Sequence, residues 1–197
     1  MRHRLVLVLA LGSACGGHAT APQAPHEPSP AVRSDIDAAE TAERARQHDV
    51  ARERYQRAVT EAGDAPSIAY ARKSFGETLA SWGEYAEAIA QYQGAIAAAP
   101  TDAQAWHDLG VLYEKQQDDR ALAAVERSHE LAPRDIPPLK TLALLYWKHG
   151  NYAAATTTYK QLLDLDIPDG LRRQVEWALD QLARPNGGRV LPGSSTR

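Results

Sequence analysis

The sequence predicts an all-α fold of repeated helix pairs, and three observations lead to this prediction. First, apolar positions recur with a period of about 34 residues, as at Phe75, Leu109 and Leu142. Second, Pro100 and Pro133 close two of these periods, at places where a proline would end a helix. Third, the residues after the last period carry an apolar stripe with the spacing of one helix face. This stripe consists of Leu171, Val175, Ala178, Leu179 and Leu182.

The composition is that of a folded protein with little net charge. Of the 197 residues, 44% are hydrophobic and 24% are charged, with a formal net charge of −3. These values exclude extensive disorder and give no sign of a nucleic-acid-binding protein. The single cysteine, Cys15, excludes an internal disulfide framework and a cysteine-based zinc site. No apolar run reaches the roughly 18 residues that a membrane-spanning helix needs.

The N-terminus has the pattern of a secretory signal peptide over residues 1–14. Two arginines precede an apolar run at 5–11, and small residues follow it. Residues 11–15 (LGSAC) resemble the lipobox of bacterial lipoproteins, in which the cysteine is lipid-modified after cleavage. The resemblance implies a lipid anchor on Cys15, and Gly16 after it favours the outer membrane, facing the periplasm. The alternative is an ordinary signal peptide, cut after Ala14 or a little later.

Both flanks of the repeat region have the composition of linkers. Residues 15–33 combine the cysteine with glycines and four prolines, which predicts a tether of roughly 55 Å when extended. Residues 185–197 contain two Pro- and Gly-rich clusters and are expected to form a flexible tail. The predicted folded part therefore lies between these two segments.

The middle repeat unit carries the most complete motif. Trp106, Leu109, Gly110 and Tyr113 have the spacing W-x2-L-G-x2-Y, and the unit closes at Pro133. This pattern resembles the tetratricopeptide repeat, a helix–turn–helix unit. The resemblance implies a short right-handed α-solenoid of about three helix pairs over residues 67–168. A degenerate N-terminal unit is expected at 34–66, and a capping helix at 169–184.

Glycines in the repeat units have two predicted uses. Gly76 and Gly110 recur at the same repeat position, where a missing side chain lets the two helices of a pair approach closely. Gly83 and the Gly150–Asn151 pair lie between the helices of a pair and predict turns there. Both uses agree with stacked helix hairpins.

No sequence motif indicates an enzyme. The sequence lacks an H-E-x-x-H metal motif, a glycine-rich phosphate loop and a G-x-S-x-G nucleophile motif. We therefore expect no catalytic residues, no metal, no cofactor and no small-molecule substrate, and we expect His107 to be an ordinary surface histidine. The alternative, an undetected ligand or catalytic site, would use His107 and Glu114 in one groove.

The resemblance also implies a binding groove lined by the first helix of each pair. Trp147 stands out, because tryptophan is a common hot-spot residue in interfaces; the alternative is that it packs on the capping helix. Glu77 and Val111 stand where the family's clamp for C-terminal carboxylates would need Asn, so no such clamp is expected. The expected groove residues are Tyr70, Lys73, Glu77, His107, Val111, Glu114, Lys140, Leu144 and Trp147.

Together these patterns predict a membrane-anchored scaffold that binds a protein or peptide partner in the cell envelope and assists assembly of an envelope complex. Lipoproteins of this architecture include pilotins, barrel-assembly lipoproteins and adaptors for peptidoglycan enzymes. The alternative is a secreted chaperone of the same fold without a lipid. Resemblance of fold does not by itself give a function.

Overall fold

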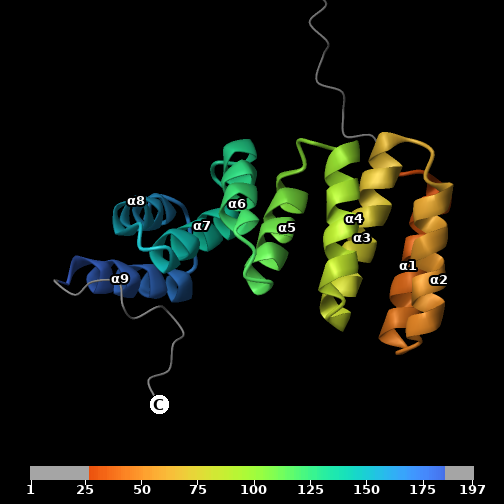
Figure 1. Cartoon of the computed structure of the whole chain (residues 1–197), viewed down its shortest axis with the longest axis horizontal. Coiled ribbons are helices and arrows are strands. Elements are labelled where there is room, and N and C mark those ends of the chain that lie inside the picture. Colours follow the sequence, from red (N-terminus) through yellow and green to blue (C-terminus); the bar gives the residue numbers. More distant parts are fainter. Residues whose placement is uncertain (1–26, 185–197) are drawn as a thin grey trace, which may run out of the picture.

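A computed structural model describes residues 27–184, and all regular secondary structure in this range is helical (Figure 1). The predicted signal peptide with Cys15, most of the predicted tether and the predicted tail lie outside the described residues. Between 27 and 184, no helix is both long and apolar enough to cross a membrane. The helices are α1 (Pro30–Arg44), α2 (His48–Glu61), α3 (Ala65–Trp82), α4 (Tyr85–Ala98), α5 (Ala103–Lys115), α6 (Arg120–Leu131), α7 (Ile136–Lys148), α8 (Tyr152–Leu163) and α9 (Asp169–Ala183).

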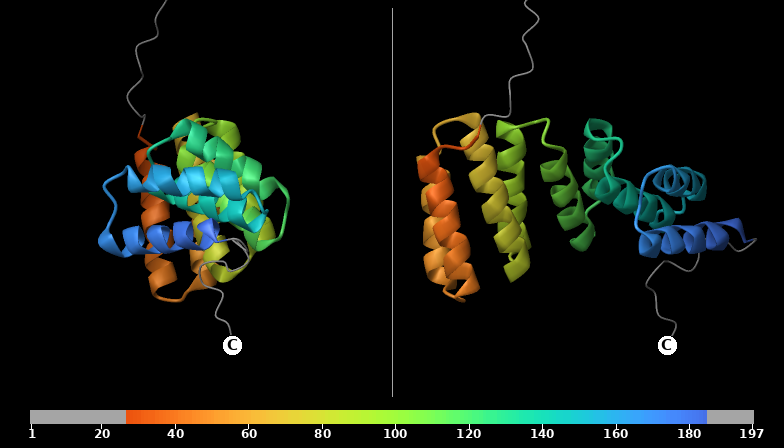
Figure 2. Two further views of the ribbon diagram at one scale, coloured as in Figure 1. Left: turned by 90° about the vertical axis from the view of Figure 1, so that its left-hand side faces the viewer. Right: turned by 180° about the vertical axis from the view of Figure 1, so that it is seen from behind.

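The helices form four hairpins that stack along one axis and end in a single helix. The hairpins are α1–α2, α3–α4, α5–α6 and α7–α8, and each packs against the next through its second helix. The stack twists along its length, so that α9 runs across the direction of α1–α4 (Figures 1 and 2). The predicted short α-solenoid with a capping helix is therefore confirmed.

The first helix begins at Pro30, four residues before the predicted start at residue 34. Proline is favourable in the first turn of a helix, where its missing N–H has no partner to lose. Ser29 caps the helix by accepting a hydrogen bond from the Val32 N–H at 3.3 Å, and Val32 is fully buried. The predicted tether therefore extends four residues too far, since the apolar face of α1 already begins at Val32.

Side chains fix the degenerate N-terminal unit to the rest of the stack. Tyr55 of α2 stacks on Phe75 of α3, with ring centroids 5.2 Å apart. Arg52 forms ion pairs with Glu84 at 2.6 Å and Glu87 at 3.0 Å. Because these contacts join α2 to the next hairpin, the degenerate unit is an integral part of the body.

A buried carboxylate and two partly exposed arginines join the two helices of this first hairpin. The Asp35 side chain on α1 is only 3% exposed, and it accepts hydrogen bonds from Arg57 and Arg54 on α2. The Arg57 guanidinium, assisted by Arg54, holds the pKa of Asp35 below its ordinary value despite burial. The carboxylate therefore stays charged at neutral pH and holds α1 against α2.

The glycine predictions are confirmed. A Cβ atom on Gly110 would lie 2.5 Å from Val125 Cγ2, and one on Gly76 would lie 3.1 Å from the Tyr92 ring. Gly83 and Gly150 adopt φ values of 84° and 76°, which glycine reaches without the strain of a side chain. The close approach within the hairpins and the turns between their helices both depend on these residues.

Candidate partner-binding surface

The odd-numbered helices α1, α3, α5, α7 and α9 form one continuous surface, which we call the inner face. Within it, α1 contacts α3 and α5 contacts α7 directly. Hollows lie between parts of α1 and α3, of α3 and α5, and of α7 and α9, and a tyrosine from the second helix of a hairpin lines each of them. These tyrosines are Tyr55, Tyr92 and Tyr159, which occupy equivalent repeat positions.

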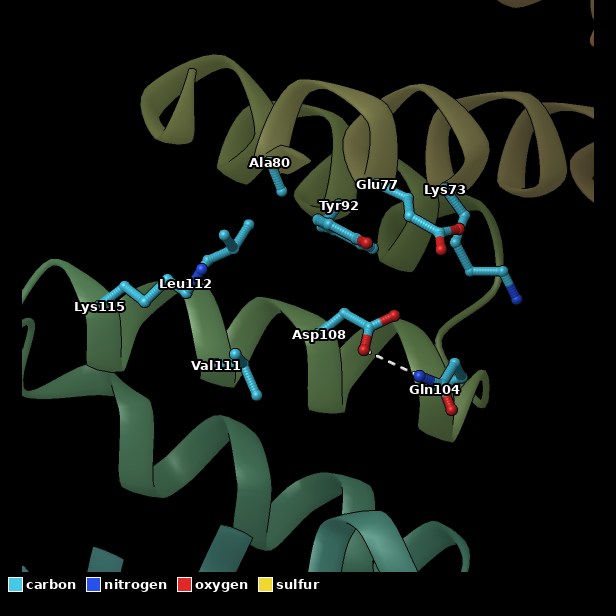
Figure 3. A pocket seen from close by; sticks show the side chains of 9 residues that line it. All are labelled: Lys73, Glu77, Ala80, Tyr92, Gln104, Asp108, Val111, Leu112 and Lys115. Carbon is cyan, nitrogen blue, oxygen red and sulfur yellow. Dashed lines mark hydrogen bonds between the residues drawn. The ribbon is translucent and has the colours of Figure 1, made fainter. Parts of the chain in front are cut away.

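The hollow between α3 and α5 has a volume of about 430 Å³. Its walls are mixed: Lys73 pairs with the Asp102 carboxylate at 2.8 Å, and Gln104 donates to Asp108 at 2.8 Å. Figure 3 shows the Tyr92 ring between the two walls. The lining residues are Lys73, Glu77, Ala80, Tyr92, Gln104, Asp108, Val111, Leu112 and Lys115.

Burial and nearby carboxylates keep the tyrosine hydroxyls of the hollows protonated. Burial first, and then Asp108 and Glu77, raise the pKa of Tyr92 far above its ordinary value. Burial raises the pKa of Tyr159 to about 12. The pKa of Tyr55 is also raised by burial, and Tyr55 accepts a hydrogen bond from Thr78 at 2.9 Å. These phenols are neutral at physiological pH and add polarity without charge.

The hollow between α1 and α3 is acidic, with a volume of about 320 Å³. Glu40 and Glu43 of α1 face Glu77 of α3 across it. Tyr70 lies half-buried on the same side of α3, and burial together with Glu40 raises the pKa of its hydroxyl. The predicted residues Tyr70 and Glu77 therefore belong to the N-terminal half of the inner face.

The hollow beside α5 and α7 differs from these three, because it lies at the C-terminal ends of the two helices, between Glu114 and Lys148, and no tyrosine lines it. Val125 replaces the tyrosine at the equivalent position of this hairpin, and His107 bridges the two helices. Its Nε2 lies 3.0 Å from Thr141 Oγ1, and its Nδ1 lies 3.1 Å from Asp108 Oδ1. His107 is only 9% exposed, so the prediction of a surface histidine in the groove is wrong.

A second polar contact joins α5 to α7 farther along the inner face. Glu114 accepts a hydrogen bond from Lys148 at 2.6 Å, and both side chains remain partly exposed. Because Glu114 lies about two helical turns beyond His107, these two residues do not form a shared site. The contact positions the two helices and leaves Glu114 neutralised.

The hollow between α7 and α9 is smaller and mostly apolar, with a volume of about 160 Å³. The predicted residues Lys140 and Leu144 line it, and Leu144 is 37% exposed. The other lining residues are Thr141, Tyr159, Leu171, Gln174 and Val175.

Trp147 does not project into the groove, so the prediction of an exposed hot-spot residue is wrong. The side chain is 1% exposed and belongs to the C-terminal core. Tyr159 meets its ring edge-on at a centroid distance of 6.1 Å, and the Trp177 ring covers it at 6.2 Å. The alternative, packing on the capping helix, is what the structure shows.

The sequence places Trp177 off the apolar stripe of its helix, either exposed or in a second contact, but Trp177 is not among the expected groove residues. It is 41% exposed and contacts Trp147. A signal was present, because Val111, Leu144 and Trp177 are separated by two equal steps, each one repeat unit long. Treating α9 only as a cap hid this period. Helix α9 occupies the position of a further inner helix. Gln174 lines the hollow between α7 and α9, and Trp177 lies one helical turn farther along the same face of α9.

The described residues contain no group of three or more His, Cys, Asp or Glu side chains arranged to hold a metal ion. His107 and Glu114, the pair considered for an undetected catalytic site, have separate partners in the structure. The surface is thus built of hydrogen-bonding, charged and apolar contacts.

Two family models match the chain, each over one part of the stack. A model described as "TPR repeat" covers residues 76–117, from α3 to the end of α5. A model described as "Tetratricopeptide repeat" covers residues 141–166, from α7 to the end of α8. The chain therefore contains tetratricopeptide repeats within residues 76–117 and 141–166. Such repeats typically form non-catalytic scaffolds that bind proteins.

Solved structures of other helical-repeat proteins share this fold. The crystal structure of MamA aligns with a TM-score of 0.59 at 21% identity, over 74% of this chain and 81% of that chain. Pseudomonas aeruginosa pilF aligns with a TM-score of 0.62 at 18% identity, over 78% and 72%. These levels of identity establish likeness of fold alone.

A third neighbour is the structure of Naa15/Naa10 bound to HypK-THB, with a TM-score of 0.58 at 18% identity. The match covers 77% of this chain and 22% of that chain, so it represents a small part of a longer protein. No curated protein sequence matches this chain.

Proposed function

We propose that the chain is a lipid-anchored adaptor of a bacterial cell envelope that recruits a protein partner through its inner face. The observation that carries the proposal is the succession of hollows along the inner helices. Their walls mix polar and apolar groups, as protein interfaces do. A partner segment that crosses several inner helices would contact them in turn.

The tetratricopeptide repeats support the protein-binding part of this proposal. The neighbour Naa15/Naa10 bound to HypK-THB is a complex of several proteins, by its own description. In this chain the hollow between α3 and α5, of about 430 Å³, has walls fixed by ion pairs and hydrogen bonds. A prearranged surface loses little conformational entropy when a partner binds.

The anchoring part of the proposal depends on the N-terminal sequence. The basic start, the apolar run at 5–11 and Cys15 have the pattern of a lipoprotein signal. Since α1 begins at Pro30, the segment from Gly16 to Ser29 connects the proposed lipid to the body. This segment could span roughly 45 Å, enough to hold the inner face clear of lipid headgroups.

Replacing the proposed lipid attachment site should abolish lipidation. We expect labelled palmitate to enter the wild-type protein, and the Cys15→Ser variant to remain an unlabelled precursor. Gel mobility and label incorporation measure both effects in the bacterial host. Normal processing without label, in both proteins, would instead indicate the secreted form without lipid.

Photo-crosslinking from defined positions tests where the partner binds. We expect a cross-linking amino acid at Glu77 or Lys140, which are exposed on the inner face, to give a discrete product with one protein of the envelope. The matched control positions Ala123 and Lys160 are exposed on α6 and α8. Products from the control positions, with none from the inner positions, would contradict the proposed binding face.

A further inference from the structure

The two halves of the inner face differ in how their cations are used. Lys73, His107, Lys140 and Arg173 follow one another at the spacing of the repeat, so they occupy equivalent positions on α3, α5, α7 and α9. Lys73 is neutralised by Asp102 at 2.8 Å, and His107 is held by Asp108 and Thr141. Within residues 27–184, neither Lys140 nor Arg173 has an ion pair or side-chain hydrogen bond, and both are exposed.

An apolar row accompanies these two cations. Val111, Leu144 and Trp177 recur at the same repeat spacing on α5, α7 and α9, whereas α3 carries Glu77 at the equivalent position. Leu144 is 37% exposed and Trp177 is 41% exposed, which is unusual for large apolar side chains in this structure. The inner face therefore changes along the stack, from an acidic hollow between α1 and α3 to exposed apolar side chains beside two unpaired cations on α7 and α9.

An apolar hollow with a cation in its lining lies between α7 and α9, the two helices that carry Leu144 and Trp177. Leu171, Val175 and Tyr159 give it an apolar lining, and its volume of about 160 Å³ is similar to that of cavities that admit a benzene ring. Lys140 stands at its edge. The hollow can accept one aliphatic or aromatic side chain, with a cation beside it.

We infer that the inner surface of α7 and α9 docks a partner segment that combines apolar side chains with Asp or Glu side chains. This inference rests on the proposed function and names the chemistry of the partner. Apolar side chains would cover Leu144 and Trp177 and fill the hollow, and carboxylates would pair with Lys140 and Arg173. Unpaired cations beside an apolar surface favour a partner with complementary charge.

Charge also argues against the chain's own C-terminal segment as the occupant. Residues 185–197 contain Arg189 and Arg197 and no acidic side chain. Docking this segment would place arginines against Lys140 and Arg173, which repels like charges. An acidic, apolar segment of another protein satisfies both features of the surface.

A panel of labelled peptides of equal length tests the inference with the full chain. Its members are a Glu/Leu peptide, a Lys/Leu peptide, a Glu/Ser peptide and a peptide of residues 185–197. We expect the Glu/Leu peptide to bind about tenfold more tightly than any other by fluorescence anisotropy, with affinity that falls as salt is raised. Thermal melts of the wild-type chain, and of each substituted chain named below, check that the protein is folded.

Matched substitutions assign the binding to the surface of α7 and α9. Lys140→Glu and Leu144→Ser should each weaken the Glu/Leu peptide about tenfold, because one removes the cation and the other the apolar contact. Lys160→Glu makes the same charge reversal on an exposed position of α8, and Tyr152→Ser removes an exposed large side chain from the same helix. Both should leave the affinity unchanged.

Several results would overturn the inference. These are tighter binding of the Lys/Leu or 185–197 peptide, no binding in the millimolar range, and equal effects of Lys140→Glu and Lys160→Glu. A dimer that dissociates on Leu144→Ser, seen by sedimentation, would assign the surface to a second copy. Cross-links from position 77 that persist in the Lys140→Glu variant would keep the adaptor function and reject only this partner chemistry.

Discussion

Replacing Trp147 with alanine is expected to lower the free energy of unfolding by about 3–5 kcal/mol, the range for truncation of a large buried aromatic residue. Trp147 is 1% exposed, and its ring contacts Tyr159 of α8 and Trp177 of α9. One indole thus joins three helices at the C-terminal end of the stack. Its loss would leave a cavity in the core of α7, α8 and α9. No further hairpin of the described chain packs on this end of the stack.

Urea unfolding followed by circular dichroism measures this effect, and hydrogen exchange locates it. Because hairpin stacks open from their ends, we expect faster exchange in α8 and α9 than in α3 and α4. Trp177→Ala is the matched control. This ring is 41% exposed, so its loss should cost about 1 kcal/mol, the order of one aromatic contact. A Trp147→Ala variant with unchanged stability would mean that the indole is not buried in solution.

The second large effect is expected for Gly110→Ala, at about 1–3 kcal/mol of destabilisation from overpacking. The new Cβ would lie 2.5 Å from Val125 Cγ2 and 3.2 Å from the Val125 backbone nitrogen. Valine has little freedom to rotate away. Helices α5 and α6 would therefore have to move apart, although alanine is the better helix former.

Gly170→Ala provides the matched control for this substitution. Gly170 also lies in a helix, and nothing stands within 4 Å of its added Cβ, so alanine should stabilise by up to about 1 kcal/mol. Removing the clash with Val125→Ala in the Gly110→Ala background should recover part of the loss. Chemical denaturation of the four proteins gives the comparison, and equal behaviour of the two glycine variants would refute close packing at Gly110.

The stack could be predicted from the sequence because each helix pair packs in the same way and needs the same residue types at equivalent positions. Gly76 and Gly110, the prolines at unit ends and the glycine turns all report local geometry, which does not depend on distant residues. The stripe on α9 was predictable for the same reason. The start of α1 was missed because prolines before Pro30 suggested a linker, whereas one proline in a first turn is compatible with a helix.

The inner face was predicted less well, because exposure depends on what neighbouring helices cover. Lys140 and Leu144 lie where the repeat register placed them. The repeat position of Trp147 also predicted a groove residue, but Trp177 covers its ring. His107 is buried by its contact with Thr141. Such contacts arise between helices of different repeat units, which are far apart in the sequence, so no local pattern reveals them.

Indole ¹H–¹⁵N spectra of the full chain test the proposed docking surface most directly, because they report on four tryptophans at once. On addition of the Glu/Leu peptide, the Trp177 signal should move most, and the Trp147 signal should follow through ring contact. Trp82 and Trp106 donate their indole N–H groups to Glu43 and to the Pro100 carbonyl, away from α7 and α9. Their signals should stay in place. Movement of Trp82 or Trp106 with an unchanged Trp177 signal would contradict the proposed surface.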